Sequence, residues 1–403
     1  MFKNHDEIRR LFPSLMRNKP YFDSASTTLK PKQVIEKVLE YYQHYPVNIH
    51  RAIYPLAEKA SYEFEKAREK LKLFINARFK EEIIITKGTT EAINLIANTW
   101  GKKNIHKNDT ILVSVLEHHS NSLPWLQLAK QKEANFKVIP INNNGDIDLD
   151  QLDKLLKGNV KLLAITYVSN VTGTQNPIKE IVKMAHQHGV CVVVDAAQAV
   201  PHIPVDVQVL DCDFLCFSGH KLYGPTGVGI LYGKKQLLET MPPYLYGGGM
   251  VSRIYQDDIL YSYLPHKFEA GTPPIAELIG LGAAIDFLQI LGFEYLAKHE
   301  DNLLKYLKEK LKQIPNIHFI GCPVKHVSVC SLIMKNVHAH DLGTLLAESD
   351  IAVRVGHHCA YPLMDFYKVP ATLRISLGLY NNNEDIDKLF LTLHKANEVF
   401  KCH

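Results

Sequence analysis

Five apolar runs in the first two thirds of the chain constrain its fold more than any other feature. They are short and almost continuously apolar, as in strands that are buried on both faces of a sheet. Helical patterns separate several of them, for example at 90–100 and at 178–189, where Gly189 suits the end of the second helix. This alternation predicts an α/β protein with a mostly parallel sheet flanked by helices. The five runs are residues 82–86, 110–115, 161–168, 191–195 and 213–218.

The pattern changes after about residue 290. A long amphipathic helix is expected over 295–314, and a short strand-like run follows at 327–334. With 403 residues, the chain is long enough for two or three domains. The expected parts are a large α/β domain at 19–285, a smaller α+β domain at 286–403, and a segment at 1–18 that packs on the smaller domain.

The charge balance argues against nucleic acid as a partner. Lys and Arg number 46 and Asp and Glu number 42, which gives a net charge of +4 with neutral His. A nucleic-acid-binding protein would carry a larger basic excess, gathered on one face. We therefore expect no nucleic-acid partner.

The cysteines and the apolar segments indicate a protein of a reducing compartment. The seven Cys form no CxxC pair, and Cys212 and Cys216 have the wrong spacing for a zinc knuckle or a thioredoxin motif. Free thiols are the simplest interpretation. The N-terminal residues contain no apolar signal core, and the longest apolar stretch, 279–293, carries Asp286 and is too short for a membrane span. We expect a cytoplasmic protein without a membrane segment.

Polar side chains follow all five apolar runs. In an open α/β sheet the carboxyl ends of the strands form the ligand site, so these side chains are predicted to meet. The segment 87–90 also opens a helix, where backbone amides and Thr hydroxyls suit an anion, unless Thr89 only caps the helix. Neither GxxxxGK[ST] nor GxGxxG occurs, which disfavours nucleotide sites of those kinds. The strand-end residues include Thr89, Thr90, His118, Asn170, Asp195, Gln198, Ser218, His220 and Lys221.

Asp195 and Lys221 are the strand-end residues that suggest a cofactor. A carboxylate at the end of a buried strand needs a partner, because an unpaired buried charge is costly. One interpretation is a structural ion pair with Lys221. The other is a pyridoxal 5'-phosphate (PLP) site, in which Lys221 forms the Schiff base and Asp195 keeps the pyridine nitrogen protonated. His118 would then stack on the ring, unless it is an ordinary core histidine. The phosphate would be bound by Ser218, His220 and Thr90.

These residues belong to a pattern that resembles a known family. Asp-Ala-Ala-Gln at 195–198, followed by SGHKLYGPTG at 218–227, is similar to the signature of the class V aminotransferases, which are fold type I PLP enzymes. Within that family the chain resembles the SufS-like, or type II, cysteine desulfurases over essentially its whole length. The resemblance implies a mostly parallel, seven-stranded sheet flanked by helices. Further matching motifs are YFDSAS (21–26), HR (50–51), GTTEAINLIAN (88–98), EHHSN (117–121), VSNVTGTQNP (168–177), FEAGTP (268–273), RVGHHCAYPLM (354–364) and LRISLGLYNN (373–382).

The resemblance implies roles around the cofactor, position by position. Lys221 would hold PLP covalently, and His118 would stack on its ring and assist proton transfer. Asp195 would pair with the pyridine nitrogen and Gln198 with the ring hydroxyl. Thr272 would reach the phosphate of the other subunit in a homodimer. The phosphate contacts implied within one subunit are Thr89, Thr90, Ser218 and His220.

The resemblance also implies a substrate site and a reaction. Arg374 would clamp the substrate carboxylate, assisted by Asn170, because an Arg fork matches a carboxylate. His50 and Arg354 would line the site. Cys359 would take the sulfur of L-cysteine as a persulfide, leave L-alanine, and pass the sulfur to a SufE- or SufU-like acceptor protein for iron–sulfur cluster assembly.

The residues around Cys359 also favour a reactive thiol on physical grounds. Cys359 follows the segment 356–358 on a predicted loop, where nearby His and the charge of Arg354 favour the thiolate. Cys191 and Cys216 lie within apolar strands and are expected in the core. The alternatives for Cys359 are an exposed bystander or a metal ligand. Adjacent ligands such as His-His-Cys rarely converge on one ion, so no metal site is expected.

Three other functions stay open at this point. A selenocysteine lyase could share the cofactor site and Cys359, which makes L-selenocysteine an alternative substrate. Another class V lyase or aminotransferase would not need this cysteine. A sulfur-transfer scaffold without catalysis is disfavoured, because every catalytic position carries the required residue. The chain departs from the family pattern at two places, Tyr54 in place of His and a short segment at 250–265. The short segment leaves the identity of the acceptor undetermined.

Overall fold

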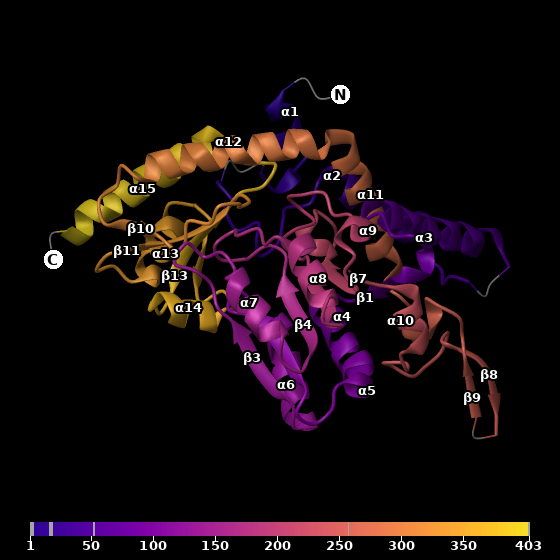
Figure 1. Cartoon of the computed structure of the whole chain (residues 1–403). Coiled ribbons are helices and arrows are strands. Elements are labelled where there is room, and N and C mark those ends of the chain that lie inside the picture. Colours follow the sequence, from indigo (N-terminus) through magenta and orange to yellow (C-terminus); the bar gives the residue numbers. More distant parts are fainter. Residues whose placement is uncertain (1–3, 16–18, 51–52, 257, 402–403) are drawn as a thin grey trace.

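The computed structural model describes residues 4–15, 19–50, 53–256 and 258–401. These residues form a seven-stranded sheet, a four-stranded sheet and a two-stranded hairpin. Figure 1 shows the larger sheet flanked by helices, with the smaller sheet beside it under two long helices. Arg51 of the HR motif lies outside the described residues.

The larger sheet follows the α/β pattern expected from the sequence. Its strands are β1 (Ile83–Thr86), β2 (Thr110–Ser114), β3 (Asn135–Ile139), β4 (Val160–Thr166), β5 (Cys191–Asp195), β6 (Phe214–Ser218) and β7 (Gly229–Gly233). Their order is β1-β7-β6-β5-β4-β2-β3. β7 is antiparallel to both neighbours, and the pairs from β6 to β3 are parallel. The predicted mostly parallel, seven-stranded sheet is therefore confirmed.

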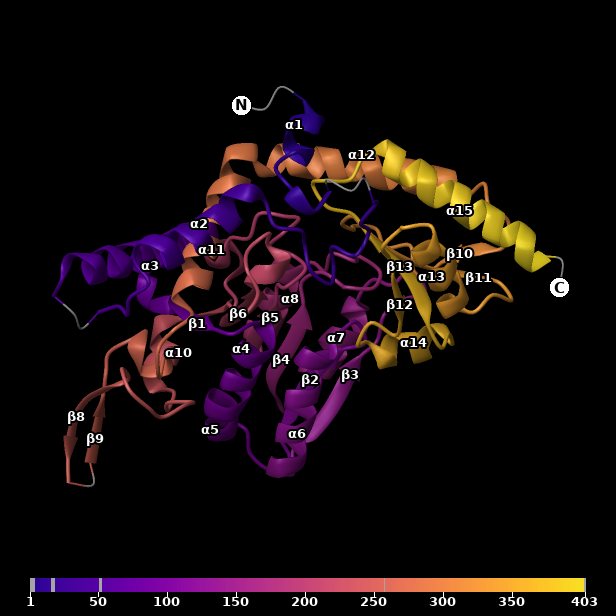
Figure 2. The same ribbon diagram turned by 180° about the vertical axis from the view of Figure 1, so that it is seen from behind.

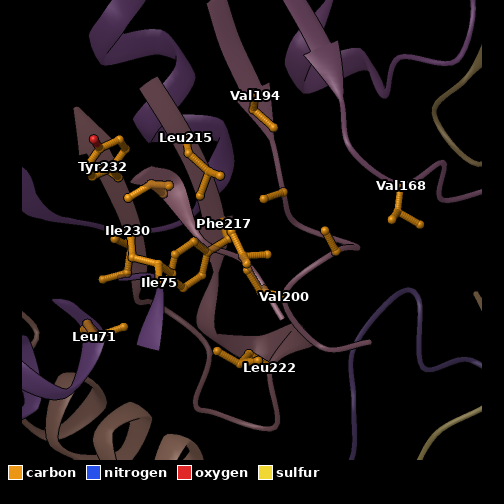
Figure 3. Packing of buried hydrophobic residues seen from close by; sticks show 14 of the residues in the cluster. Leu71, Ile75, Val168, Val194, Val200, Leu215, Phe217, Leu222, Ile230 and Tyr232 are labelled. Atoms are coloured by element: carbon orange, nitrogen blue, oxygen red, sulfur yellow. The ribbon is translucent and has the colours of Figure 1, made fainter. Parts of the chain in front are cut away.

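Alternate side chains of these strands pack into two apolar cores, one on each face of the sheet. The covering helices are α3 (Pro55–Phe74), α4 (Thr89–Ile96), α6 (Leu123–Lys132), α7 (Leu149–Leu156), α8 (Ile178–His186) and α11 (Ile275–Leu291). Ile85 of β1 packs on the face covered by α3, α7, α8 and α11, and its neighbour Ile84 packs on the face covered by α4 and α6. Figure 3 shows part of the first core, with Phe217 of β6 beside Ile230 of β7 and Ile75, and with Leu71 of α3 in the same cluster. Burial on both faces explains the continuous apolar runs in the sequence.

The C-terminal part forms an antiparallel sheet. In spatial order its strands are β10 (Ile317–Phe319), β11 (Val329–Met334), β13 (Thr372–Ser376) and β12 (Arg354–Gly356). The helices of this part are α12 (Phe293–Leu311), α13 (Ala339–Glu348), α14 (Tyr361–Tyr367) and α15 (Asn383–Lys401). One apolar core joins these strands to α12, α13 and α15, and it also includes Phe22. The next residue, Asp23, forms a parallel bridge with Ser376 of β13, so the N-terminal segment extends this sheet.

The two sheets are connected through α11 and through the N-terminal segment. α11 runs without a break through residue 285. Helix α1 (His5–Arg9) packs near α12 and α15, because His5 stacks on His299 and Arg9 pairs with Asp385. The division of the chain into domains at residues 285 and 286 stays a prediction.

A hairpin projects from the larger part of the molecule. It consists of β8 (Val251–Tyr255) and β9 (Asp258–Tyr261), and Figures 1 and 2 show it extending away from the helices around it. The remaining helices are α2 (Lys32–His44), α5 (Lys102–Asn104), α9 (Val207–Leu210) and α10 (Lys235–Thr240). Within the described ranges, no single helix is long and apolar enough to cross a membrane. Only α11 and α12 taken together meet that test, and a bend of 79° separates them.

Some element boundaries differ from the sequence pattern for local reasons. The run 161–168 predicts one strand, but β4 ends at Thr166, because Val168 leaves the sheet and pairs with Gln175. The helix expected over 90–100 ends as an α-helix at Ile96 and continues as a π-helical turn over Ala97–Gly101.

Candidate active site

A cavity of about 530 Å³ opens at the carboxyl ends of β4, β5 and β6. This is the edge of the sheet at which the sequence predicts the ligand site. The start of α4, the loop after β2 and residues of β12 and β13 complete the walls. Twelve of the fourteen predicted site residues line the cavity, namely Thr89, Thr90, His118, Asn170, Asp195, Gln198, Ser218, His220, Lys221, Arg354, Cys359 and Arg374.

The N-terminus of α4 forms an end of the cavity that is rich in hydroxyl groups. Thr89 N–H donates to Ser218 Oγ over 2.8 Å, and Thr89 Oγ1 lies 2.7 Å from the same oxygen. Thr90 Oγ1 lies 2.8 Å from Ser120 Oγ. Gly88 is the N-cap residue, so the alternative in which Thr89 only caps the helix is wrong. Hydroxyls at a helix N-terminus favour an anion such as phosphate.

The middle of the cavity presents a buried carboxylate and an unsatisfied amide oxygen. Asp195 ends β5, and its Oδ1 accepts a hydrogen bond from Ala197 N–H over 2.9 Å. Burial raises the pKa of this carboxyl. Gln198 Nε2 donates to Ala25 O, whereas Gln198 Oε1 is buried without a hydrogen-bond partner. An unsatisfied buried acceptor is costly, so this wall suits a ligand that carries a hydrogen-bond donor.

Lys221 lies in a 3₁₀ turn that follows β6. Burial lowers the pKa of Lys221 to about 8, although the negative charge of Asp195 acts in the opposite direction. With that pKa, about a tenth of the amine is neutral at pH 7. In the part of the chain that the structure describes, Lys221 and Asp195 form no ion pair with each other. A structural salt bridge therefore does not explain the presence of the two residues. A partly neutral, buried amine is suited to act as a nucleophile or a base.

His118 faces the cavity as a neutral ring. Burial, together with the positive charge of Lys221, lowers the pKa of His118 to about 3. His118 Nδ1 accepts a hydrogen bond from Ser120 N–H over 3.1 Å, so the ring proton is assigned to Nε2. Because the ring lines a cavity, it is not an ordinary core histidine. A neutral aromatic ring in this position is suited to stack on a flat ligand.

Two arginines and one aspartate give the cavity a positively charged end. Arg374 of β13 is buried, and it donates from Nη1 to Asn170 O over 3.0 Å and from Nη2 to Asp23 Oδ1 over 3.2 Å. Arg354 of β12 donates to both oxygens of Asp23, with a shortest distance of 2.7 Å. Arg374 Nε is buried without a partner. Two cations and one anion leave a net positive charge, which suits a substrate carboxylate.

Cys359 lies half-buried on the loop between β12 and α14. His357 Nδ1 accepts from Cys359 N–H over 3.0 Å, and Cys359 O accepts from His119 N–H over 2.8 Å. Asn170 Nδ2 donates to His358 O over 2.9 Å. His358 and Cys359 have φ values of 52° and 55°, a conformation that costs free energy for residues other than glycine. The hydrogen bonds offset this strain and hold the cysteine at the cavity.

Comparison with known proteins identifies the family. The model of the class V aminotransferase family matches residues 20–389. The chain belongs to this family. Over 400 residues it is 45% identical to the cysteine desulfurase of Escherichia coli (strain K12 / DH10B), covering 98% of each chain. The resemblance inferred from the motifs is thereby confirmed, and the chain is an enzyme of the cysteine desulfurase group within the class V aminotransferases.

Two solved structures of this group are similar over the whole chain. The cysteine desulfurase CsdA of Escherichia coli has a TM-score of 0.93 and 39% identity, covering 99% of this chain and 100% of the other. The cysteine desulfurase of Thermococcus onnurineus NA1 has a TM-score of 0.95 and 35% identity, covering 99% of each.

PLP is the cofactor of this class V aminotransferase, and the cavity fits it. The hydroxyl groups and the helix N-terminus at α4 suit the phosphate. Gln198 Oε1 offers the acceptor that a ring hydroxyl would satisfy, and Asp195 can pair with a protonated ring nitrogen. Lys221 provides the amine that holds PLP. The pairing of each residue with a particular atom of PLP stays a prediction.

Two of the predicted site residues do not line the cavity. His50 is exposed at the end of the segment that follows α2, where its ring packs against the rings of Phe64 and His266. Thr272 is exposed as well. Within one subunit, neither reaches the residues around Lys221. Their predicted roles at the cavity stay predictions.

Sequence reasoning assigned no role to three residues in or near the cavity. Asp23 and Glu117 stand within the family motifs YFDSAS and EHHSN, which was the available signal. Glu117 is buried behind His118 and accepts hydrogen bonds from Thr166 N–H and from side chains on either side of it. Burial raises the pKa of Glu117 to about 8. His340 lines the cavity from the start of α13, and no sequence motif marked it.

Proposed function

We propose that this enzyme transfers the sulfur of L-cysteine to Cys359 as a persulfide and releases L-alanine. One observation carries the proposal: Cys359, Lys221 and Arg374 line the same cavity. A single substrate molecule can therefore present its sulfur, its α-carbon and its carboxylate to the three groups. Electrostatic interaction with Cys359 raises the pKa values of both Lys221 and Arg374, as expected for groups that share one small space.

Arg374 is the residue proposed to bind the substrate carboxylate. Its Nη1 and Nη2 are held by Asn170 O and Asp23, which fixes the plane of the guanidinium group. Its Nε–H is buried and has no hydrogen-bond partner among the described residues. A charge-assisted hydrogen bond to a carboxylate is stronger than one between neutral groups. Arg354 adds a second positive charge at the same end of the cavity.

Lys221 Nζ is the proposed base for the α-proton of the substrate. When bound, PLP withdraws electrons from the α-carbon of an amino acid and makes that proton acidic. Once free of the cofactor, Lys221 Nζ can accept it, because burial keeps its pKa near 8 rather than above 10. His118 lines the same cavity, where its neutral ring is suited to stack on the cofactor.

Cys359 Sγ is the proposed nucleophile for the substrate sulfur. A bond forms between Sγ and that sulfur while the bond between the sulfur and Cβ breaks. The electron pair of the broken bond stays with the substrate carbon, which takes up a proton and becomes the methyl group of alanine. L-cysteine and a Cys359 thiol thus give L-alanine and a Cys359 persulfide, with no outside oxidant or reductant. The hydrogen-bonded loop keeps Sγ at the cavity during this step.

We propose that the persulfide then passes to a SufE- or SufU-like acceptor protein, for iron–sulfur cluster assembly. The acceptor thiolate would attack the outer sulfur, and the bond between that sulfur and Cys359 Sγ would break to restore the Cys359 thiolate. Access from outside is supported by Tyr361, which begins α14 two residues after Cys359 and is exposed. The cytoplasmic location expected from the sequence stays a prediction.

We further propose that the enzyme acts as a homodimer. Helix α2 exposes Ile35, Leu39 and Tyr42 at positions that share one face. Exposed apolar faces of this kind mark interfaces between proteins. A second subunit would also explain why His50 and Thr272 lie outside the cavity of their own subunit. Leu39→Glu should lower the molecular mass measured by light scattering, whereas unchanged dimer mass would contradict this interface.

The experiment that tests the proposed reaction measures alanine released from L-cysteine by the PLP-bound enzyme. Without reductant we expect about one equivalent of alanine per subunit, because the persulfide blocks a second turnover. With a reductant that removes the persulfide, turnover should continue. Cys359→Ala should abolish alanine release in both conditions. Cys322→Ala is the matched control, because Cys322 is exposed and does not line the cavity.

Each other outcome points to a different function. No alanine from L-cysteine, but rapid alanine release from L-selenocysteine, would indicate a selenocysteine lyase. Full activity of Cys359→Ala would indicate another class V lyase or aminotransferase. Absence of PLP absorbance from the purified protein would indicate a scaffold without catalysis.

A further inference from the structure

The carbonyl oxygen of His220, the residue before Lys221, accepts an unusual number of hydrogen bonds. Lys30 Nζ donates to it over 2.7 Å. Thr28 donates to it twice, from its N–H and from Oγ1, each over 3.1 Å, and Thr27 Oγ1 also lies 3.1 Å away. A carbonyl oxygen has two lone pairs, so four donors exceed what this acceptor normally satisfies. All four come from one short segment, residues 27–30.

Lys30 occupies a position that is unfavourable for a cation. Its ammonium group donates to neutral oxygens, namely His220 O, Thr28 O at 2.6 Å and Thr27 Oγ1 at 3.3 Å. No carboxylate among the described residues forms an ion pair with it, and burial lowers its pKa to about 7. Lys30 is half-buried, and a charge that is partly removed from water without a counter-charge costs stability. We therefore expect Lys30 to have a role other than stabilising the fold.

The segment 27–30 holds the turn of Lys221 on both sides. Before Lys221, the four donors meet at His220 O. After it, Thr28 Oγ1 accepts a hydrogen bond from Tyr223 N–H over 2.9 Å. The turn itself is short, a single 3₁₀ turn over Gly219–Lys221, and has few hydrogen bonds of its own. The geometry of this turn therefore depends on its hydrogen bonds with the segment 27–30.

We propose that Lys30 is a positioning residue for Lys221. Its ammonium group fixes the His220 carbonyl, and with it the peptide that leads to Lys221 and the direction in which the amine meets PLP. The same peptide carries the His220 ring, which lines the cavity. Burial and the positive charges of Lys221 and Lys30 lower the pKa of His220 to about 4, so this ring is neutral. Loss of Lys30 would change both the geometry and the electric field at the cofactor.

This inference rests on the proposed role of Lys221 as the residue that holds PLP. Lys221→Ala tests that role alone, because its PLP absorbance should lack the band of a lysine-bound cofactor. If Lys221→Ala keeps that band, the proposed function is wrong whatever Lys30 does. If it loses the band, the variants of Lys30 can be interpreted.

Two readouts on the holoenzyme test Lys30, and neither depends on turnover. The first is the rate at which PLP leaves during gel filtration or dialysis, followed by absorbance. Lys30→Met should release PLP about ten times faster or more, because a hydrogen bond from a charged donor is lost. The second is the pH titration of the lysine-bound cofactor band, whose midpoint should shift in Lys30→Met. A purely structural role would lower thermal stability without moving this midpoint.

Matched variants distinguish the effect of the positive charge of Lys30 from the effect of its hydrogen bonds. Lys30→Arg keeps a cation and should restore the midpoint in part. Lys32→Met removes an exposed lysine of α2 that pairs with Glu36 at the surface, and it should behave as the wild type. If Lys30→Met does not fold, Lys30→Gln, which keeps a donor without the charge, takes its place. Wild-type PLP release and an unshifted midpoint in a folded Lys30 variant would overturn the proposal.

Discussion

Asp23 Oδ1 accepts a hydrogen bond from Arg374 Nη2 over 3.2 Å, and the same carboxylate binds Arg354 through both oxygens. Asp23 precedes these partners in the sequence by 331 and 351 residues. Burial lowers the pKa of Arg374 to about 10, and the charge of Asp23 opposes that change. Asp23 therefore keeps the buried guanidinium charged and fixes its orientation.

Asp23→Asn should impair substrate binding and also lower the stability of the fold. The amide leaves the buried Arg374 without its counter-charge, and removal of one partner of a buried pair is strongly destabilising. We expect kcat/KM for L-cysteine to fall by about tenfold to a hundredfold, mainly through KM, which corresponds to about 1.5–3 kcal/mol. Steady-state alanine release measures both constants.

The control for Asp23→Asn is Asp350→Asn. Asp350 pairs with Lys19 at the surface, and both side chains are exposed. Surface pairs of this kind contribute little to stability, so this variant should behave as the wild type. An unchanged KM in Asp23→Asn would show that Arg374 binds substrate without help from Asp23.

The parallel strands could be predicted from the sequence because both of their faces are buried. β5 and β6 are apolar up to their last residues, Asp195 and Ser218, and the polar residues from there on mark the ligand edge. β3 was not predicted, because it lies at the edge of the sheet and exposes Asn135 and Lys137. β7 was not predicted either; it is short, begins and ends with glycine, and enters the sheet antiparallel between β1 and β6.

The cofactor residues could be predicted for the same reason. The two arginines of the charged end were predicted only from the family resemblance, and two other residues at that end were not predicted at all. The carboxyl ends of parallel strands lie at the same edge of a sheet. The topology therefore predicts that Asp195 and Lys221 lie close together. Asp23, by contrast, meets Arg374 only because the N-terminal segment pairs with β13. His340 reaches the cavity only because the smaller sheet packs against the larger one. Neither spacing nor periodicity signals such contacts.

Recombination of PLP with the cofactor-free enzyme should become faster as pH rises toward 8. The neutral amine of Lys221 is the nucleophile, and burial places its pKa at about 8. Below that pKa the neutral fraction rises about tenfold for each pH unit, and above it the fraction levels off. Stopped-flow absorbance after mixing with PLP measures the rate. A rate that keeps rising up to pH 10 would indicate an unperturbed lysine.

His186 should stabilise the fold at mildly acidic pH and lose that effect at alkaline pH. A hydrogen bond to Asp213, at 2.9 Å from Nε2, raises the pKa of His186 above its usual value of 6.5. A group whose pKa is raised by folding contributes fully below its unfolded pKa, and the contribution is lost as pH rises through the folded pKa. His186→Gln should thus lower Tm clearly at pH 6 and little at pH 9.

The control for His186 is His188→Gln. His188 is exposed two residues further along the chain. Its substitution should leave the pH dependence of Tm unchanged. Equal Tm differences at pH 6 and pH 9 in His186→Gln would mean that packing, and not the charge on the imidazole, accounts for its contribution.

Arg68 and Glu269 form a buried ion pair that anchors the segment before Thr272 to the edge of the large sheet. The two side chains meet at 2.7 and 2.9 Å, and Glu269 Oε1 also accepts from Ile85 N–H of β1 over 2.8 Å. Their side chains are only 1% and 6% exposed. Glu269→Gln leaves the Arg68 charge buried without its main partner, so we expect the free energy of unfolding to fall by about 3 kcal/mol.

Urea unfolding followed by tryptophan fluorescence measures this loss, because Trp100 and Trp125 both pack in the core on the far face of the same sheet. The matched control is Glu65→Gln. Glu65 contacts the same Arg68 at 3.3 Å but is 34% exposed, so its loss should cost less than about 1 kcal/mol. If both variants lose the same stability, the burial of the Arg68–Glu269 pair does not determine how much it stabilises the fold.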